Sequence, residues 1–502
     1  MKNSFYIYTM LACLITSLHS CQLTEELDDY KPLYALEAET AINTQETAEL
    51  ALVGAYATFR QKSSGGAFPD MLLTPDILSG YSTVGPFYVT RPENAGFISN
   101  NPLATGTSTT LRIYTGLYDL INRTNWLINA VDKLDDNVFE PASRRMEIIA
   151  EAKTLRALGH FYLLRNFGQF YDTSSEYGIN LRLEPVRSDE AFPRNTVAET
   201  YDAILTDLDA GILEGPELRS KRYTNKVFAK ALKAKVLLYM GQYPESATLA
   251  KDVIDNSGSN FMLEPTYGAI FDEHESTAIF NSSEILFGTS GEPNAGIGIG
   301  NFYSGFSATI TQKYLDAVGG SMDINGQIID IDGTQRADAI VFENFSYGGF
   351  YSTKYTSYFT SGDYEMIYHM RMAEVYLILA EASARANNAV TTDALNALNA
   401  VRLRAGAATT GGDGFETYPA TIGLDQFLTA VRYEKLAELY QEGGESWYDL
   451  IRYDYADGFD SGFMVSDIKP TATDPDKFIL PIPTESIDAG GNVVAQNPGY
   501  TN

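Results

Sequence analysis

Apolar residues recur at helical spacing through most of the chain, with polar positions between them. This period predicts seven long helices, over residues 47–60, 111–134, 142–170, 196–212, 367–385, 391–404 and 424–442. Thr196, with Glu199 three residues later, forms a capping box that marks the start of the fourth helix. Because strand patterns do not alternate with these helices, a parallel sheet is not expected.

Residues 225–256 predict two helices that pack against each other. Gly241 separates them, Pro244 starts the second helix, and Ala247 and Ala250 are small enough to let the pair approach closely. This pattern is similar to a tetratricopeptide repeat. The helices predicted over 367–385 and 391–404 form a second pair of this kind. We therefore expect a mainly α fold built on tetratricopeptide-like helix pairs.

Three long stretches lack a clear period, namely residues 61–110, 172–194 and 281–363. Loops of this length usually carry function or are insertions. Aromatic residues gather among Gly, Ser and Asn in the first stretch at Tyr81, Phe87, Tyr88 and Phe97, and in the third at Phe302, Tyr303 and Phe306. We interpret these two clusters as ligand-binding platforms that stack against sugar faces or peptide side chains. The alternative is that the rings only anchor the loops onto the helices.

The first 20 residues differ from the rest. Lys2 precedes an apolar run over residues 5–18, which is typical of a secretory leader and short for a membrane span. The sequence Leu18-His19-Ser20-Cys21 resembles the bacterial lipobox, in which the leader is removed and the cysteine carries lipid. Because Cys13 lies in the leader, Cys21 is the only cysteine of the mature chain, and an intrachain disulfide is not expected. The alternative is an ordinary signal peptide followed by an incidental cysteine.

The net charge and the composition limit the classes of molecule that the protein is expected to bind. The chain has 36 Lys and Arg against 65 Asp and Glu, a formal net charge of −29, which repels the phosphates of nucleic acids. Hydrophobic residues make up 44%, so the chain can bury a large core. Tyr is abundant, with 33 residues against 2 Trp, and its amphipathic ring suits wet recognition surfaces. We expect a folded protein that does not bind nucleic acid.

The sequence contains only incomplete forms of the motifs that are typical of metal-binding and catalytic sites. His160, His274 and His369 lie far apart in the sequence and are expected to be structural. Sequences similar to calcium loops begin at Asp323 and Asp330, but neither has the glutamate at position twelve. Trp126 and Trp447 are expected in the core. We therefore expect no metal, no cofactor and no catalytic residues.

Clustered carboxylates could still make a glycosidase. Glu434, Glu438 and Glu442 share one helix face, and Arg432, Lys435 and Arg452 are expected to neutralise them. Arg371, Glu374, Glu381 and Arg385 likewise predict an internal ladder of ion pairs. Such pairing lowers a carboxyl pKa, whereas a general acid needs a raised one, so a structural role is preferred to catalysis.

Several segments, taken in order, resemble the RagB/SusD family of nutrient-uptake lipoproteins of the Bacteroidetes. They are residues 118–126 (YDLINRTNW), 151–157 (EAKTLRA), 371–377 (RMAEVYL), 398–406 (LNAVRLRAG), 438–443 (ELYQEG), 447–453 (WYDLIRY), 480–483 (LPIP) and 496–500 (QNPGY). The resemblance implies a SusD-like helical scaffold with long aromatic loops. The organisation we expect is a signal peptide at 1–20, a lipid-anchored acidic tether at 21–44, an N-terminal helical region at 45–262 and a C-terminal RagB/SusD region at 263–502.

The resemblance also implies a function. Such proteins look like lids over a SusC-type TonB-dependent transporter in the outer membrane and capture oligosaccharides or peptides at the cell surface. They are not enzymes, and only the lipid anchor on Cys21 would touch the membrane. Two alternatives remain open, a glycoside hydrolase on a helical scaffold and a tetratricopeptide-type adaptor that binds only protein.

Overall fold

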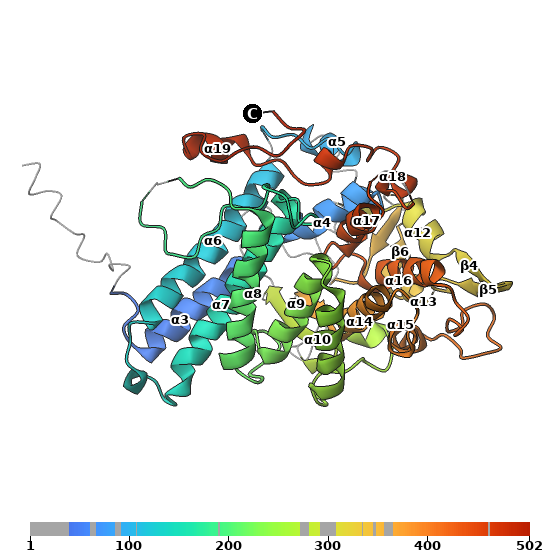
Figure 1. Ribbon diagram of the computed structural model, residues 1–502, viewed down its shortest axis with the longest axis horizontal. Helices are drawn as coiled ribbons and strands as arrows, with labels where there is room; N and C mark the ends of the chain where they lie inside the picture. The colour runs from blue at the N-terminus through green and yellow to red at the C-terminus, as the bar shows by residue number, and fades with distance from the viewer. Residues whose placement is uncertain are drawn as a thin grey trace, which may run out of the picture.

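A computed structural model describes most of the chain (Figure 1). The described residues are 40–60, 67–85, 92–106, 108–188, 191–271, 281–291, 308–333, 335–344, 348–355, 365–459 and 462–501. The predicted lipidation site Cys21 and the predicted ligand residues Phe87, Tyr88, Phe302, Tyr303 and Phe306 lie outside them. Helices dominate the described part, which confirms the mainly α prediction.

Four long helices form one half of the molecule and lie side by side in Figure 1. They are α3 (Gln45–Tyr56), α6 (Ser108–Val131), α7 (Ser143–Phe167) and α8 (Val197–Glu214), and a 3-10 helix over Ala57–Arg60 extends α3. Each lies within a few residues of a predicted helix. The capping box of α8 is confirmed, since the Glu199 amide donates to Thr196 Oγ1 at 3.1 Å and the Thr196 amide donates to Glu199 Oε2 at 2.8 Å.

The predicted helix pairs are present. The first consists of α9 (Lys226–Tyr239) and α10 (Tyr243–Asn256), and the second of α14 (Met372–Asn387) and α15 (Thr392–Arg404). Gly241 turns the chain between α9 and α10 with a φ of +74°, a left-handed conformation that glycine adopts without strain. Because α10 packs against both α9 and α14, the two pairs form one continuous row of helices.

The C-terminal part completes the helical body. It contains α16 (Leu424–Leu439), α17 (Glu445–Ala456), α18 (Val465–Ile468) and α19 (Thr484–Ala489), with a 3-10 turn at Pro475–Lys477. Two more 3-10 turns of the same length lie at Asp136–Val138 and Gly268–Ile270. None of the helices in the described part of the chain combines the length and the apolar character needed to cross a membrane.

Two of the three stretches that lack a clear period contain regular structure. The first holds α4 (Ala67–Ser79), β1 (Ser82–Val84) and α5 (Pro92–Ile98), and the third holds β2 (Ile285–Gly291) to β7 (Phe350–Ser352) with α12 (Gln312–Val318) and α13 (Gln335–Ile340) between them. Described residues of α4 are buried on all sides, so the helix has no amphipathic period to detect. Most of the strands have only three or four residues, too few for an alternation to stand out. The described part of residues 172–194 has neither helix nor strand.

The strands form three small antiparallel sheets. The four-stranded sheet has the order β1-β3-β7-β6, where β3 is Ala308–Ile310 and β6 is Val341–Glu343. β2 pairs with β8 (Glu365–Arg371), and β4 (Ser321–Ile324) pairs with β5 (Gln327–Asp330). Asn325 and Gly326 make the turn of the β4–β5 hairpin with positive φ angles, and Asp323 Oδ1 accepts the Gly326 amide at 2.6 Å. One of the two sequences similar to calcium loops is therefore a hairpin turn.

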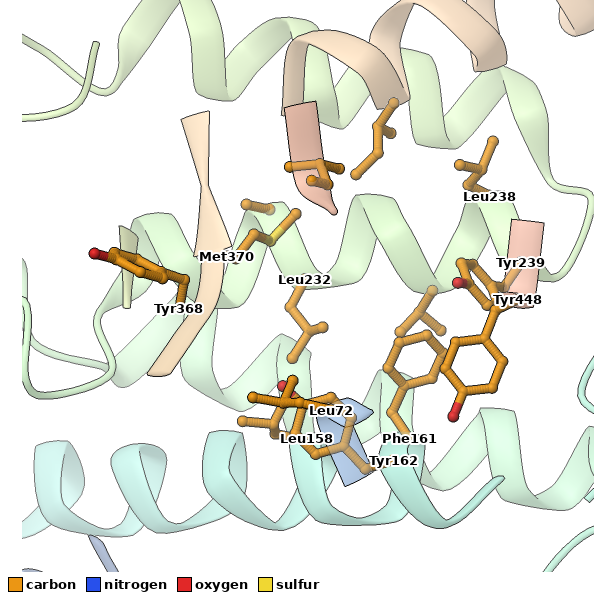
Figure 2. Close-up of a cluster of buried hydrophobic side chains, with 14 of the residues drawn as sticks. Leu72, Leu158, Phe161, Tyr162, Leu232, Leu238, Tyr239, Tyr368, Met370 and Tyr448 are labelled. Carbon is orange, nitrogen blue, oxygen red and sulfur yellow. The ribbon is translucent and has the colours of Figure 1, made fainter. Parts of the chain in front are cut away.

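The core lies where these elements meet (Figure 2). Leu72 of α4, Leu158 and Phe161 of α7, and Leu232 of α9 point into one cluster of buried side chains, which also receives Met370 from β8. Segments that lie far apart in the sequence thus share one apolar interior. Burial of such area is the main favourable contribution to folding.

Replacing Leu158 with alanine should lower the free energy of unfolding by about 2–5 kcal/mol, because the side chain is 1% exposed and its removal leaves a cavity. Leu213→Ala on α8 is the matched control, since Leu213 is 71% exposed and its loss should change stability by less than about 0.5 kcal/mol. Urea unfolding of both variants measures the difference. Equal effects would contradict the position of Leu158 in the core.

Candidate ligand-binding site

The two segments predicted to carry ligand-binding aromatics are joined by a strand pair. β1 and β3 are antiparallel, with Ser82 opposite Ile310 and Val84 opposite Ala308. Phe87 follows Val84 by three residues and Phe306 precedes Ala308 by two. The chain therefore leaves β1 and enters β3 at the same end of this strand pair, whereas Tyr81 precedes β1 at the opposite end. The pairing thus joins two stretches that are distant in the sequence.

Tyr81 and Phe97 are placed differently from what the sequence predicts. Their side chains are 3% and 2% exposed and belong to the core, which contradicts the expected exposed rings. The Tyr81 ring packs edge-on against Tyr314, at 6.4 Å between ring centroids. These two rings anchor the segment onto the scaffold, which was the alternative interpretation. The other five aromatic residues lie outside the described part, so their role in binding stays a prediction.

Tyr440, the residue that directly follows α16, holds β1 in place. The Tyr440 hydroxyl donates to the Tyr81 carbonyl at 2.9 Å and lies 2.6 Å from Ser82 Oγ. The Tyr440 ring stacks on Tyr314 of α12, with 3.8 Å between centroids. Burial raises the pKa of Tyr440 well above its usual value, so the hydroxyl keeps its proton for this hydrogen bond. β1 therefore rests on a rigid, fully buried support.

A buried cluster of ion pairs fixes the position of α16 itself. Five cationic side chains meet five carboxylates there, namely Arg336, Arg371, Arg402, Arg404 and Lys354 with Glu284, Asp332, Glu434, Glu438 and Glu442. We call these ten residues the central charge cluster. All ten are buried, and the signs balance within it. Buried charges are tolerated when they are compensated and hydrogen-bonded in this way.

Glu438 is the most connected member of the central charge cluster. It contacts Arg404 at 2.5 Å, Arg371 at 3.0 Å and Arg336 at 3.2 Å. Burial alone raises its pKa, but the three arginines outweigh burial and hold the pKa far below the usual value. Glu442 is kept ionised in the same way by Arg371 and Lys354, which lower its pKa.

The predicted compensation of these glutamates is confirmed, but its partners are not those expected. Among the described residues Arg432 forms no ion pair with them, and Lys435 and Arg452 bind Glu381 instead, at 2.8 and 3.0 Å. The four charged residues expected to form one ladder of ion pairs along α14 do not all pair with one another, because Glu374 pairs with Lys235 of α9 at 2.5 Å. Sequence spacing identifies the face of a helix but not the distant element that covers it. All three glutamates on this face are buried and engaged in ion pairs, whereas a general acid must reach its substrate.

Two histidines are structural, as expected. His369 lies in an aromatic cluster, stacked on Phe287 at 4.7 Å, with Tyr162 and Thr289 at hydrogen-bond distance from its two ring nitrogens. Burial lowers the pKa of His369 to about 3, and burial with the charge of Arg156 does the same for His160. His274 lies outside the described residues. Within the described part, no group of three or more His, Cys, Asp or Glu side chains is arranged to hold a metal ion.

Polar residues of α6 and α7 hold the irregular segment that follows α7. Asn125 donates to the carbonyls of Arg182 and Glu184 at 2.9 and 3.0 Å, and Arg156 donates to the Leu183 carbonyl at 2.9 Å. Tyr118 and Asn122 bind the same segment at Asn180 and Val186. This segment borders a hollow of about 630 Å³ that is open to solvent and is lined by residues 181–188 and 192–195. The sequence analysis did not predict this contact, although Asn122 and Asn125, polar residues within the predicted helix 111–134, are a signal that could have indicated it.

Trp447 is buried as predicted, with its indole nitrogen donating to the Phe478 carbonyl at 3.0 Å. Trp126 is only partly buried, and the guanidinium of Arg187 covers its ring at 4.7 Å. The expectation of a core position therefore holds fully for Trp447 and only in part for Trp126.

Comparison with known protein families gives two matches. The SusD family matches residues 333–500, and a family described as starch-binding and associating with the outer membrane matches residues 90–238. A SusD-like protein of Bacteroides ovatus is 25% identical over 388 residues, which span 68% of this chain. The match covers 65% of that relative, slightly less than two thirds of its length.

Solved structures share the fold. A putative sugar binding protein from Bacteroides vulgatus superposes with a TM-score of 0.72 at 24% identity, over 92% of this chain and 100% of the other. A laminarin-binding SusD-like protein superposes with a TM-score of 0.67 at 21% identity, over 91% and 100%. At these identities the similarity establishes a common architecture.

Replacing Arg371 with methionine should lower the free energy of unfolding by about 3–5 kcal/mol, because Glu284, Glu438 and Glu442 would lose a shared partner inside the core. Arg123→Met is the control, since its pair with Asp119 is exposed and contributes at most about 1 kcal/mol. Urea unfolding at pH 7 compares the two. A loss for Arg371→Met no larger than that of the control would show that the cluster is dispensable.

Stability should fall as pH drops from about 6.5 to about 3. His369 has a folded pKa of about 3 and an ordinary pKa of 6.5, so the unfolded chain binds a proton in this range that the folded chain does not. His369→Gln should reduce the slope of unfolding free energy against pH by about 1.4 kcal/mol per pH unit between these values. Thr289→Val removes a partner of His369 but no titrating group, so it should shift the curve without changing its slope. An unchanged slope for His369→Gln would contradict the neutral buried histidine.

Proposed function

Because this chain belongs to the RagB/SusD family, we propose that it binds oligosaccharides at the cell surface and delivers them to a SusC-type TonB-dependent transporter in the outer membrane. The observation that carries the binding proposal is the pairing of β1 with β3. The chain leaves β1 toward Phe87 and Tyr88 and enters β3 after Phe306 at the same end of one strand pair, which supports a stacking surface built from two loops.

The class of ligand follows from what the relatives are called. One matching family is described as starch-binding, and solved structures of the same fold carry the names laminarin-binding and putative sugar binding protein. Sugar rings present apolar faces that stack on aromatic side chains. Phe87, Tyr88, Phe302, Tyr303 and Phe306 are the residues we propose for this contact. Peptides remain the second class that such a surface can bind.

The cellular setting is part of the same proposal. The leader at residues 1–20 and Cys21 would place the protein on the membrane through a lipid anchor alone, and the acidic tether to residue 44 would hold the helical body away from the lipid surface. The name of the matching family, which includes association with the outer membrane, supports this location. Chemistry on the ligand is not part of the proposal, because the carboxylates on the charged face of α16 are engaged in ion pairs.

Tyr88→Ala and Tyr303→Ala should each weaken oligosaccharide binding by about tenfold or more while leaving the helical fold intact, since a stacking aromatic is an energetic centre of a binding surface. Titration calorimetry against neutral oligosaccharides, and against mixed peptides as a second panel, measures the effect. Tyr455→Ala is the control, because Tyr455 lies exposed on α17.

Three results would contradict the proposal. Unchanged affinity in both variants would reject the aromatic segments as the site. Binding of peptides without binding of oligosaccharides would show that the ligand is a peptide and not a sugar. Release of shorter sugars during incubation would establish hydrolysis instead of capture.

A further inference from the structure

Two lysines lie close together beside Gly80, immediately before β1. Lys313 belongs to α12, and Lys469 directly follows α18, elements that lie next to each other in Figure 1. Both ammonium nitrogens approach the position that a Cβ on Gly80 would occupy, Lys469 Nζ to 3.3 Å and Lys313 Nζ to 3.4 Å. The distance between the two nitrogens therefore cannot exceed the sum of these two distances. Like charges this close repel each other.

Carboxylates are missing from the described surroundings of this pair. Among the described residues, no acidic side chain lies within ion-pair distance of Lys313 or Lys469, although the chain carries a net charge of −29. Three buried lysines have a carboxylate partner, namely Lys235 with Glu374, Lys354 with Glu442 and Lys435 with Glu381. The buried Lys221 has no ion pair in the described part, but its ammonium group donates to two backbone carbonyls, those of Asn260 and Ile285. The pair at Gly80 differs because two ammonium groups lie close together without a carboxylate.

The ammonium groups also keep most of their hydrogen-bond donors. A lysine has three N–H donors, and the only acceptor for this pair in the described part is the Ser79 carbonyl, 2.9 Å from Lys313 Nζ. Both side chains are half-buried, so their donors are partly removed from water but still accessible. Arg432 adds positive charge nearby, since its charge acts on the hydroxyl of Tyr81 and lowers the pKa of that group against the effect of burial.

The pKa values of the two lysines are lowered, as expected for two cations that lie close together and are partly buried. Burial and the charge of Lys469 lower the pKa of Lys313 to about 8, and burial lowers the pKa of Lys469. Two half-buried cations that face each other without a counter-charge destabilise each other in the free protein. A bound anion would remove that repulsion.

We propose that Lys313 and Lys469 together bind an oxyanion group, a sulfate ester or a carboxylate. Each ammonium donates to one oxygen of the anion at about 2.8 Å, and two oxygens of one such group lie about 2.4 Å apart, so the group can bridge nitrogens up to about 8 Å from each other. The two distances measured at Gly80 keep the nitrogens within that reach. Gly80 leaves open the space between the ammonium groups that a larger residue would fill.

The position of the pair favours an acidic oligosaccharide as the source of the oxyanion. Tyr81 and Thr311 flank the Ser82–Ile310 end of the β1–β3 pair, and the aromatic segments join its other end, two residues or about 7 Å away. This choice of source rests on the proposed function, whereas the oxyanion site itself does not. A free inorganic anion is the other possible source.

The test is titration calorimetry of the purified protein with sodium sulfate, against sodium chloride at equal ionic strength. Sulfate should bind the wild type, and the double variant K313Q/K469Q should bind at least about tenfold more weakly, because each charged hydrogen bond contributes strongly. K133Q removes a lysine from the exposed surface beyond α6 and should bind like the wild type. The double variant should melt no lower than the wild type in chloride, since it loses a repulsion. K313R/K469R keeps both charges and should retain binding.

Titrations with a sulfated oligosaccharide and with its unsulfated parent distinguish an acidic glycan from a free inorganic anion as the natural ligand of the lysine pair. Tighter binding of the sulfated form than of free sulfate, lost in K313Q/K469Q, would identify the acidic glycan. Binding of free sulfate alone would support the site and assign it to inorganic anions. An absence of sulfate binding in the wild type, or equal binding by K313Q/K469Q, would overturn the site. Binding of the neutral parent reports separately on the proposed glycan function, because it does not depend on the two lysines.

Discussion

Compensation of buried charge is the constraint on which the rest of this structure depends. Glu434, Glu438 and Glu442 lie at and just beyond the end of α16, and each would cost several kcal/mol if it were buried without a cation. Their partners come from α13, β8, α15 and the residues after β7, so neutralising these carboxylates requires all four parts of the chain to converge on α16. Three of the segments that resemble the RagB/SusD family, at 371–377, 398–406 and 438–443, supply members of this cluster. One electrostatic requirement thus accounts for charged positions in three of the eight segments that carry the resemblance.

The central charge cluster also determines where the β1–β3 strand pair lies, through the residues that follow α16. α16 ends at Leu439, and the next residue, Tyr440, holds the Tyr81 carbonyl and Ser82 in place. Lys354 follows β7 in the same sheet and donates to the Tyr440 carbonyl at 2.7 Å. A shift of α16 would therefore move β1, β3 and both segments attached to them. A surface made of two loops can be specific only if their attachment points are fixed in this way.

Local patterns in the sequence predicted the helices but not how distant segments meet. The 3.6-residue period located most of the long helices within a few residues, and small residues identified the pair α9–α10. The prediction of a helix over 367–385 was wrong at its start, because residues 367–371 belong to strand β8 and α14 begins at Met372. The same reasoning failed where a partner decides the outcome. Tyr81 looked exposed because its neighbours are Gly and Ser, yet Tyr314, from a distant part of the sequence, covers its ring. The partners of Glu438 lie 34 to 102 residues away, and the approach of Lys313 to Lys469 involves a still larger separation. Contacts of this kind leave no period or motif for a single sequence to display.

The distribution of charge determines where this acidic protein can bind an acidic ligand. The central charge cluster contains cations and carboxylates in equal number, so the excess of negative charge lies outside it. That field weakens beyond about 8 Å at physiological ionic strength, but close to the surface it repels any anion. Neutral sugars are indifferent to it, because stacking and hydrogen bonds do not depend on net charge. An acidic ligand can be held only where cations remain without carboxylate partners, and the lysines beside Gly80 satisfy that condition within the described structure, next to the strand pair that anchors the aromatic segments.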